Sequence, residues 1–344
     1  GAVQQAASEA MEGIRGAAVA LDPSTGAILA MVSHPTFDPN DLAGHDLSAL
    51  DDNYKKLNTD PQRPLVNRSI NGVLYPPGSI FKVFFSAAAL SSGVYTEDSM
   101  LPGPAVLELP GTTASLPNMF PGACGANDQV SFTRAMAISC NTAFASVGMD
   151  IGADALRAQA EKFGFGDSLS VPMRVTPSTI PAELNMPQLA QSSIGQFDVR
   201  VTPLQMAMVA AGVANDGAVM KPYLVQSVIG SDLSVIETTD PQELSQAVTP
   251  DVAAQLTRMM EAVVTDGSGT RAQIDGVAVA GKSGTAQHGE GRKPHAWFIS
   301  FAPADDPQIA VAVIAEDGGT TGSEIGGGRV AAPIARQMME ARLK

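Results

Sequence analysis

The fold is decided by the stretch Gly276-Val277-Ala278-Val279-Ala280-Gly281-Lys282-Ser283-Gly284-Thr285, in which apolar residues lead into a lysine, two hydroxyls and two glycines. Such a composition predicts a strand that begins at Val277 and continues past Gly281. A cation and two hydroxyls along a strand edge can bind a carboxylate, and glycine lets another backbone approach closely. The candidate binding residues are therefore Lys282, Ser283, Gly284 and Thr285.

The same stretch matches the P-loop pattern of nucleotide-binding proteins letter for letter, from Gly276 to Ser283. That interpretation requires a flexible phosphate cradle followed directly by a helix. Here the four variable positions are Val-Ala-Val-Ala, which favour a strand, and residues 284–289 carry no helical pattern. We therefore interpret the segment as part of a sheet.

Four more strands are predicted, two near each end of the chain. Residues 17–22 and 26–33 form a hairpin around Pro23-Ser24-Thr25-Gly26, and strands at 296–302 and 308–315 follow the deciding stretch. Short turns between the late strands favour antiparallel pairing. The sequence thus predicts a central, mainly antiparallel five-stranded sheet.

Helices are predicted mainly in the middle of the chain. Residues 34–78 are polar and predicted mostly as loop, and residues 100–130 hold five prolines and predict an irregular excursion. The predicted helices are Ser79–Leu90, stopped by Gly93; 133–163, with breaks near Ser139 and Gly152; 203–215 and 250–266, capped by Thr202 and Thr249; and a closing helix, 330–343.

The expected fold class is α/β (α+β), a sheet flanked by helices with an inserted all-helical lobe. We expect one domain over residues 1–344, with a sheet subdomain at about 15–75 and 220–344 and a helical lobe at about 76–219.

Ser79 and Lys82 are the first candidate catalytic pair. On a helix, residues three apart share a face, and a serine in the first turn lies near the positive end of the helix dipole. Phenylalanines at 81, 84 and 85 supply apolar neighbours that would disfavour the ammonium form of Lys82 and make it a usable base. Taken alone, the pattern fits equally a helix with one surface serine and one surface lysine.

Ser139-Cys140-Asn141 forms a second candidate cluster, at the predicted break between helical segments. The hydroxyl can relay a proton, and the carboxamide can hold the amide of a ligand. Taken alone, either residue is equally consistent with a helix cap.

The order and spacing of the three motifs are more informative than any one of them. Ser-x-x-Lys, Ser-x-Asn and Lys-Ser-Gly in this order resemble the class B penicillin-binding transpeptidases, whose fold is shared with serine β-lactamases. Other segments that resemble this family are the opening hairpin, Tyr75–Ser79, Gln196 with Val201–Ala207, and His295–Phe298. The resemblance covers nearly the whole chain.

The resemblance implies a role for each motif residue. Ser79 would attack the bond between two D-alanines of a peptidoglycan stem peptide, with Lys82 as its base, and β-lactams would acylate the same serine. Ser139 would pass the proton to the leaving D-alanine, and Asn141 would position Lys82 and the donor peptide. Lys282, Ser283 and Thr285 would hold the terminal carboxylate, and the backbone N–H groups of Ser79 and Thr285 would form the oxyanion hole.

The two cysteines, Cys124 and Cys140, are expected to form a disulfide, because a domain of this family is extracytoplasmic. Closing a loop of that size would contribute about 3 kcal/mol in the entropic model. The alternative is two buried free thiols.

Composition restricts the partners. A net charge of −14 argues against nucleic acid, and no run of 18 apolar residues could span a bilayer. Four scattered histidines, His34, His45, His288 and His295, predict no metal cluster, and the resemblance implies no cofactor. Because the chain starts at Gly1 without a leader, we interpret it as a piece of a longer protein. Family analogy implies an N-terminal membrane anchor, a pedestal, a polytopic glycosyltransferase partner, and a place at the extracytoplasmic face of the cell membrane.

Three alternatives remain. A β-lactamase would need a hydrolytic glutamate, for which Pro181-Ala182-Glu183-Leu184-Asn185 offers a candidate. A non-catalytic β-lactam sensor or cell-wall binding module would share the serine and lysine. A catalytic histidine, His288 or His295, is the weakest hypothesis, because the lysine and second serine replace it.

Overall fold

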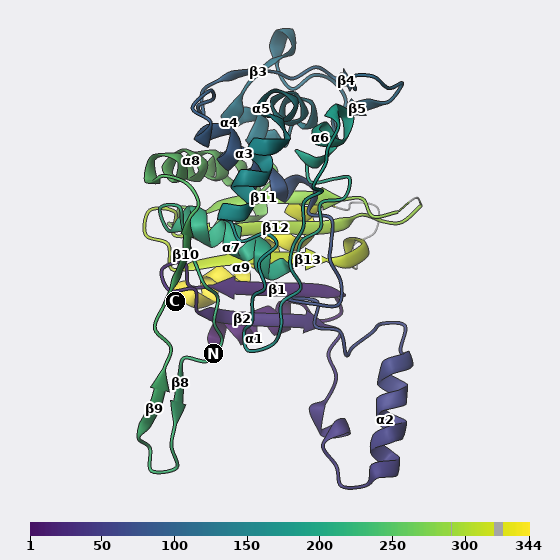
Figure 1. Cartoon of the computed structure of the whole chain (residues 1–344), viewed down its shortest axis with the longest axis vertical. Helices are drawn as coiled ribbons and strands as arrows, with labels where there is room; N and C mark the ends of the chain where they lie inside the picture. The colour runs from purple at the N-terminus through teal and green to yellow at the C-terminus, as the bar shows by residue number, and fades with distance from the viewer. Residues whose placement is uncertain (290, 320–325) are drawn as a thin grey trace.

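A five-stranded sheet forms the centre of the molecule (Figure 1). The computed structural model describes residues 1–289, 291–319 and 326–344. The strands run in the spatial order β11 (Ala280–Ala286), β12 (His295–Ala302), β13 (Ile309–Ala315), β1 (Gly16–Leu21) and β2 (Ile28–His34). Every neighbouring pair is antiparallel. The predicted fold class is confirmed, and β11 lies at the edge of the sheet.

The sheet is buried on both faces, as the two-residue period of its strands requires. Along β13, Ile309, Val311 and Val313 belong to one apolar core, and the residues between them belong to the other. Helices α1 (Ala2–Ala10) and α9 (Gly327–Leu343) cover the first face, and α7 (Pro203–Ala214) covers the second.

A group of helices packs at the β11 end of the sheet (Figure 1). It comprises α3 (Phe81–Ser91), α4 (Phe132–Ile138), α5 (Asn141–Lys162), α6 (Met186–Ser192) and α8 (Pro250–Asp266). The predicted breaks are present, because Ser139 has φ 61° and Gly152 has φ 82°. Ser139 thus ends α4 in a left-handed conformation, which turns the chain sharply into α5.

Short elements complete the chain between these helices and strands. The irregular excursion at 100–130 contains only three-residue strands and one 3₁₀ turn, as its prolines predict. The short strands are β3 (Met100–Pro102), β4 (Val106–Glu108), β5 (Ser115–Pro117), β6 (Gln129–Ser131), β7 (Ala218–Met220) and β10 (Glu243–Gln246). The 3₁₀ turns are η1 (Pro39–Leu42), η2 (Gly78–Ile80), η3 (Ala126–Asp128), η4 (Thr270–Ala272) and η5 (Glu316–Gly318).

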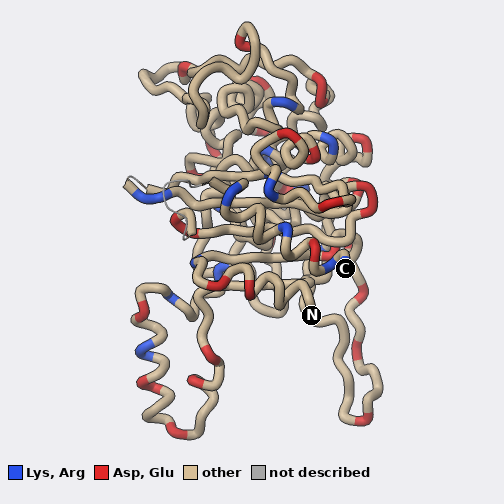
Figure 2. Tube along the Cα trace, turned by 180° about the vertical axis from the view of Figure 1, so that it is seen from behind, with Lys and Arg blue, Asp and Glu red and all other residues tan. Residues whose placement is uncertain are grey.

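Two segments project from the body, α2 (Leu47–Thr59) and the hairpin of β8 (Ser227–Ile229) and β9 (Val235–Thr238) (Figure 1). Both carry acidic residues (Figure 2). The prediction of loop was wrong for α2. The carboxylate of Asp46 accepts the N–H groups of Ser48 and Ala49, and this N-cap starts a polar helix that buries none of its residues.

The start of β11 also differs from the prediction. The strand begins at Ala280, because Val277 donates its N–H to the carbonyl of Ile274 and closes a tight turn. None of the helices in the described residues is long and apolar enough to cross a membrane.

Candidate active site

Residues from all three sequence motifs meet around one cavity of about 230 Å³ between β11 and the helices. Ser79 lies in η2 at the start of α3 and is 9% exposed. Asn141 from the start of α5 and Thr285 from β11 line the same cavity. Segments that are far apart in the sequence therefore surround one serine hydroxyl.

Lys82 lies one turn after Ser79 and is completely buried. Its Nζ donates to the carbonyl of Ser139 and to Asn141 Oδ1, both at 2.8 Å, and lies 3.2 Å from Ser139 Oγ. Burial, and secondarily the charge of nearby Lys282, holds the pKa of Lys82 well below its ordinary value. The two carbonyl oxygens can take both N–H bonds of the neutral amine, so that its lone pair remains available for a hydroxyl.

Lys282 lies on the opposite side of Ser139. Its Nζ is 3.0 Å from Ser139 Oγ and 2.8 Å from the carbonyl of Ser283. Burial lowers the pKa of Lys282 to about 7. One hydroxyl therefore bridges two buried amines, Lys82 and Lys282, and protons can pass along this chain.

Glycines bring β11 against the start of α3. A Cβ on Gly284 would lie 2.9 Å from the side chain of Ile80, and a Cβ on Gly78 would lie 2.7 Å from the carbonyl oxygen of Thr285. Neither position has room for a side chain, and Gly78 also has φ 56°. This contact sets the backbone of Thr285 beside that of Ser79.

Ser283 has a partner that the sequence did not indicate. Its Oγ lies 2.6 Å from the Oγ of Ser268, which follows α8. The N–H of Ser268 donates to the carbonyl of Ala137 near the end of α4. Ser268 thus connects β11 to the segment that carries Ser139.

Asn118 is a second residue that sequence reasoning missed. Its Oδ1 accepts the N–H groups of Asn141 and Thr142, at 3.0 and 3.2 Å, and so caps α5 from a distant segment. Cys140, which occupies the N-cap position, makes no such bond. Pro117 accepts a hydrogen bond from Asn141 Nδ2. The proline-rich excursion therefore holds Asn141 in place.

A disulfide joins Cys124 and Cys140, as expected, and ties the same excursion to the start of α5. Both residues are buried. The cross-link and the Asn118 cap act on one point of the chain, directly beside the Ser139 hydroxyl.

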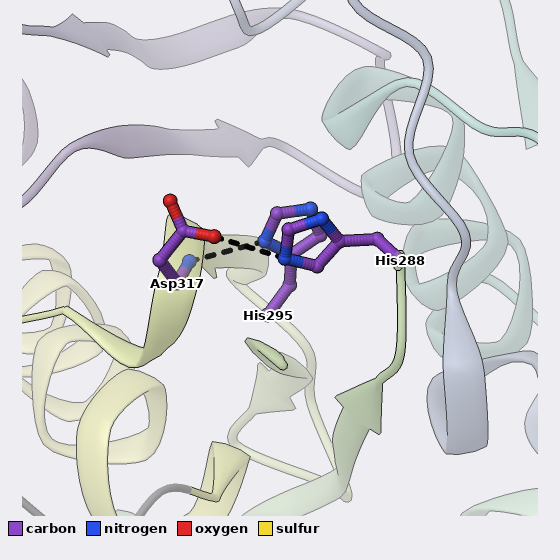
Figure 3. A group of neighbouring side chains, drawn as sticks. All are labelled: His288, His295 and Asp317. Atoms are coloured by element: carbon purple, nitrogen blue, oxygen red, sulfur yellow. Dashed lines mark hydrogen bonds and ion pairs between the residues drawn. The ribbon is translucent and has the colours of Figure 1, made fainter. Parts of the chain in front are cut away.

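Two histidines come together, although their separation in the sequence predicted no cluster. The rings of His288 and His295 stack with centroids 3.7 Å apart, beside Asp317 (Figure 3). One ligand atom from each of the three residues lies within 4.8 Å of the others. Burial, and secondarily the charge of His288, lowers the pKa of His295 to about 4. Neither histidine lines the Ser79 cavity.

Glu183, the candidate hydrolytic residue of a β-lactamase, is exposed. It is absent from the described residues that line the Ser79 cavity. The residues that follow Glu183 in the chain and do line the cavity are Gln191, Ile194, Gln196 and Phe197.

The chain belongs to the penicillin-binding transpeptidase family, since the model of the penicillin binding protein transpeptidase domain matches residues 16–340. Among individual proteins, it is similar to the peptidoglycan D,D-transpeptidase PbpA of Mycolicibacterium smegmatis, with 49% identity over 99% of this chain and 71% of that protein. PbpA of Mycobacterium tuberculosis is 44% identical over the same shares. The ceftriaxone acyl-enzyme complex of penicillin-binding protein A from M. tuberculosis superimposes with a TM-score of 0.95 and 44% identity, covering 100% of this chain and 78% of that one.

Proposed function

We propose that this chain is the catalytic domain of a peptidoglycan D,D-transpeptidase, which crosslinks stem peptides through an acyl-enzyme on Ser79 and is inhibited covalently by β-lactams. The observation that carries the proposal is the burial of Lys82. A lysine that is fully buried, holds its two N–H bonds on carbonyl oxygens and lies one turn from Ser79 has the properties of a general base.

In the first step, Ser79 Oγ attacks the carbonyl carbon between the two D-alanines, and Lys82 takes the hydroxyl proton. The tetrahedral oxyanion receives the backbone N–H groups of Ser79 and Thr285. Such a donor is worth on the order of 10²–10³ in rate. The proximity of β11 to the start of α3 supports this pairing.

The proton then reaches the leaving amine of D-alanine through Ser139, whose hydroxyl lies between the two lysine amines. The C–N bond breaks and an ester on Ser79 remains. Lys282, Ser283 and Thr285 hold the carboxylate of the terminal D-alanine. An acceptor amine attacks the ester, a new amide forms, and Ser79 regains its proton.

Benzylpenicillin tests the proposal. We expect the intact mass of the protein to rise by one penicillin, with the label on Ser79 in a peptide map and no label on Ser79→Ala. Incubation of the chain with a D-Ala-D-Ala donor peptide and an amine acceptor should give a crosslinked product. A mass that never rises would refute the acyl-enzyme, rapid loss of the adduct would favour a β-lactamase, and a stable adduct without any peptide product would favour a sensor.

The remaining family expectations are also proposals. We infer that the domain works at the extracytoplasmic face of the cell membrane, which the disulfide supports, because such bonds persist in oxidising compartments. We infer a polytopic glycosyltransferase partner from family analogy alone. Co-purification of a longer protein containing this chain from detergent-solubilised membranes, with and without crosslinking, tests both points.

We also propose that the Ser79 cavity lies between a sheet subdomain, at about 15–75 and 220–344, and a helical lobe at about 76–219. Helix α8 packs on both α4 and β11 and so joins the two parts. Native-state hydrogen exchange tests the division, because the amides of the two parts should then exchange as two separate cooperative units.

A further inference from the structure

A second, larger cavity of about 870 Å³ adjoins the Ser79 cavity. Phe197 and Gln287 line both. Gln287 comes directly after the end of β11, two residues beyond Thr285. At a rise of about 3.3 Å per residue, a peptide that follows β11 away from Ser79 would enter this cavity within about two residues.

Arginines are concentrated around this second cavity, in a chain whose net charge is −14. Among the residues that the structure describes, five arginines line it, against two carboxylates, Glu316 and Asp317. We call it the arginine pocket, after Arg15, Arg63, Arg68, Arg200 and Arg292. For these described side chains, five guanidinium charges minus two carboxylate charges leave an excess of three positive charges when the histidines are neutral.

The two carboxylates are already neutralised inside the wall. Glu316 pairs with Arg15 at 2.6 Å and Arg68 at 2.9 Å, and accepts the hydroxyl of Tyr75. Asp317 pairs with Arg15 and lies 2.9 Å from the Nε2 of His288. Each of the four carboxylate oxygens therefore already has a hydrogen-bond or ion-pair partner in the wall.

Three of the arginines already have partners. Arg15 and Arg68 pair with the two carboxylates, and Arg200 donates to backbone carbonyls and pairs with Asp198. Arg63 and Arg292 are exposed, and their guanidinium groups have no hydrogen bond or ion pair to any residue that the structure describes. Two unpaired cations that face the same cavity can together receive an anion.

The histidine pair in the wall does not favour a metal ion instead (Figure 3). Asp317 is bound by Arg15, and the Nδ1 of His295 accepts the N–H of Asp317 at 3.1 Å. A divalent cation would have to break both contacts and enter a pocket with excess positive charge. The chemistry of the pocket therefore selects a negative ligand.

We propose that the arginine pocket binds a carboxylate carried by the donor stem peptide, on a residue that precedes the D-Ala-D-Ala end, with Arg63 and Arg292 as its ligands. The inference rests on the proposed function and adds a specificity element to it. Lys282, Ser283 and Thr285 would recognise the terminal carboxylate on one side of Ser79, and the arginine pocket would recognise a second carboxylate on the other.

A matched pair of peptides tests this. The first is Nα-acetyl-Nε-succinyl-L-Lys-D-Ala-D-Ala, and the second carries a neutral succinamoyl group of the same size. Each is used to slow the acylation of the full chain by a fluorescent benzylpenicillin at 0.15 M salt, about the ionic strength at which distant exposed charges are screened. We expect the succinyl peptide to compete about tenfold better, as charge-assisted hydrogen bonds allow. The variant R63Q/R292Q should remove that preference.

Lys293→Gln is the matched control, because Lys293 lies on the same loop as Arg292 but does not line the pocket. It should keep the preference. Benzylpenicillin carries no carboxylate on its side chain, so all variants should be acylated at the wild-type rate, which also shows that they fold. Equal or absent competition by the two peptides, with penicillin acylation intact, would overturn the arginine pocket alone. Loss of acylation in the wild-type chain would remove the proposed function and this inference with it.

Discussion

The Ser79 cavity and the arginine pocket share a wall, but the basic side chains of the first are buried and two of those of the second are exposed. Around Ser79, Lys82 and Lys282 are fully buried, and burial lowers the pKa of each. In the arginine pocket, Arg63 and Arg292 lie open to solvent and have no partner among the described side chains.

The contrast follows from the chemistry of the two side chains. An amine can lose its proton when it is desolvated, whereas a guanidinium stays charged at any ordinary pH. A buried lysine is therefore suited to proton transfer, whereas an exposed arginine is suited to binding a carboxylate. Substitutions that exchange these properties test whether the two cavities are specialised in this way.

The largest effect is expected from Lys82→Arg. An arginine would place a permanent positive charge next to Ser79 and could not accept its proton, so acylation by benzylpenicillin should fall by about 10²–10⁴. Stopped-flow or quenched mass measurements of the acylation rate check this. Lys56→Arg on the projecting helix α2 is the control and should react normally. A rapid reaction of Lys82→Arg would mean that Lys82 acts only as a charge.

Loss of the disulfide comes next. Replacing both Cys124 and Cys140 by serine should lower the free energy of unfolding by about 3 kcal/mol. Without the disulfide, the unfolded chain gains conformational entropy, because the two positions, 16 residues apart, are no longer held together. Urea denaturation of the oxidised wild type and the double variant measures the difference. The arginine pocket lies away from this link, so R63Q/R292Q should leave the unfolding midpoint in place. Equal midpoints for wild type and the cysteine variant would show that the cross-link contributes nothing.

The pKa of Lys282 predicts a dependence of stability on pH. Its ordinary value is 10.5 and its value in the folded protein about 7, so the unfolded chain binds more protons between these limits. Stability then rises with pH across this window, by up to about 1.4 kcal/mol per pH unit, and is lost as pH falls toward 7.

Comparison with Lys282→Met isolates this contribution. The stability of wild type minus that of Lys282→Met should increase by about 2 kcal/mol from pH 7 to pH 9, measured by urea denaturation at each pH. Lys221→Met, at an exposed position directly after β7, should show no such slope relative to wild type. A flat difference for Lys282→Met would mean that Lys282 stays charged in the fold.

The sheet, its helices and the three motifs could be predicted from the sequence because they depend on local signals. The hairpin of β1 and β2, the caps at Thr202 and Thr249 and the break at Ser139 each follow from a few adjacent residues. The spacing of Ser79, Ser139 and Lys282 identified the family, which the match over residues 16–340 confirms.

Other features could not be predicted because their partners are far apart in the chain. Ser268 meets Ser283 across 15 residues, and His288 meets Asp317 only through the arrangement of the sheet. The arginine pocket combines residues 15, 63, 68, 200 and 292, none of which has a local pattern. Tertiary contacts of this kind carry no periodicity that a sequence would reveal.

Asn118 is such a residue, and it gives the smallest expected effect. Asn118→Ala should leave the N–H groups of Asn141 and Thr142 without their acceptor and cost about 1–2 kcal/mol of stability. Because Asn141 holds Lys82, acylation by benzylpenicillin should also slow by about tenfold.

Asp46→Ala separates the two consequences. It removes a comparable cap from α2, which projects away from the body, and should leave acylation unchanged. If Asn118→Ala lost stability but reacted with penicillin as fast as Asp46→Ala, the excursion would stabilise α5 without positioning the catalytic lysine. The specialisation of the Ser79 cavity would then depend on the residues that contact Lys82 directly, and the support from the proline-rich excursion would be structural alone.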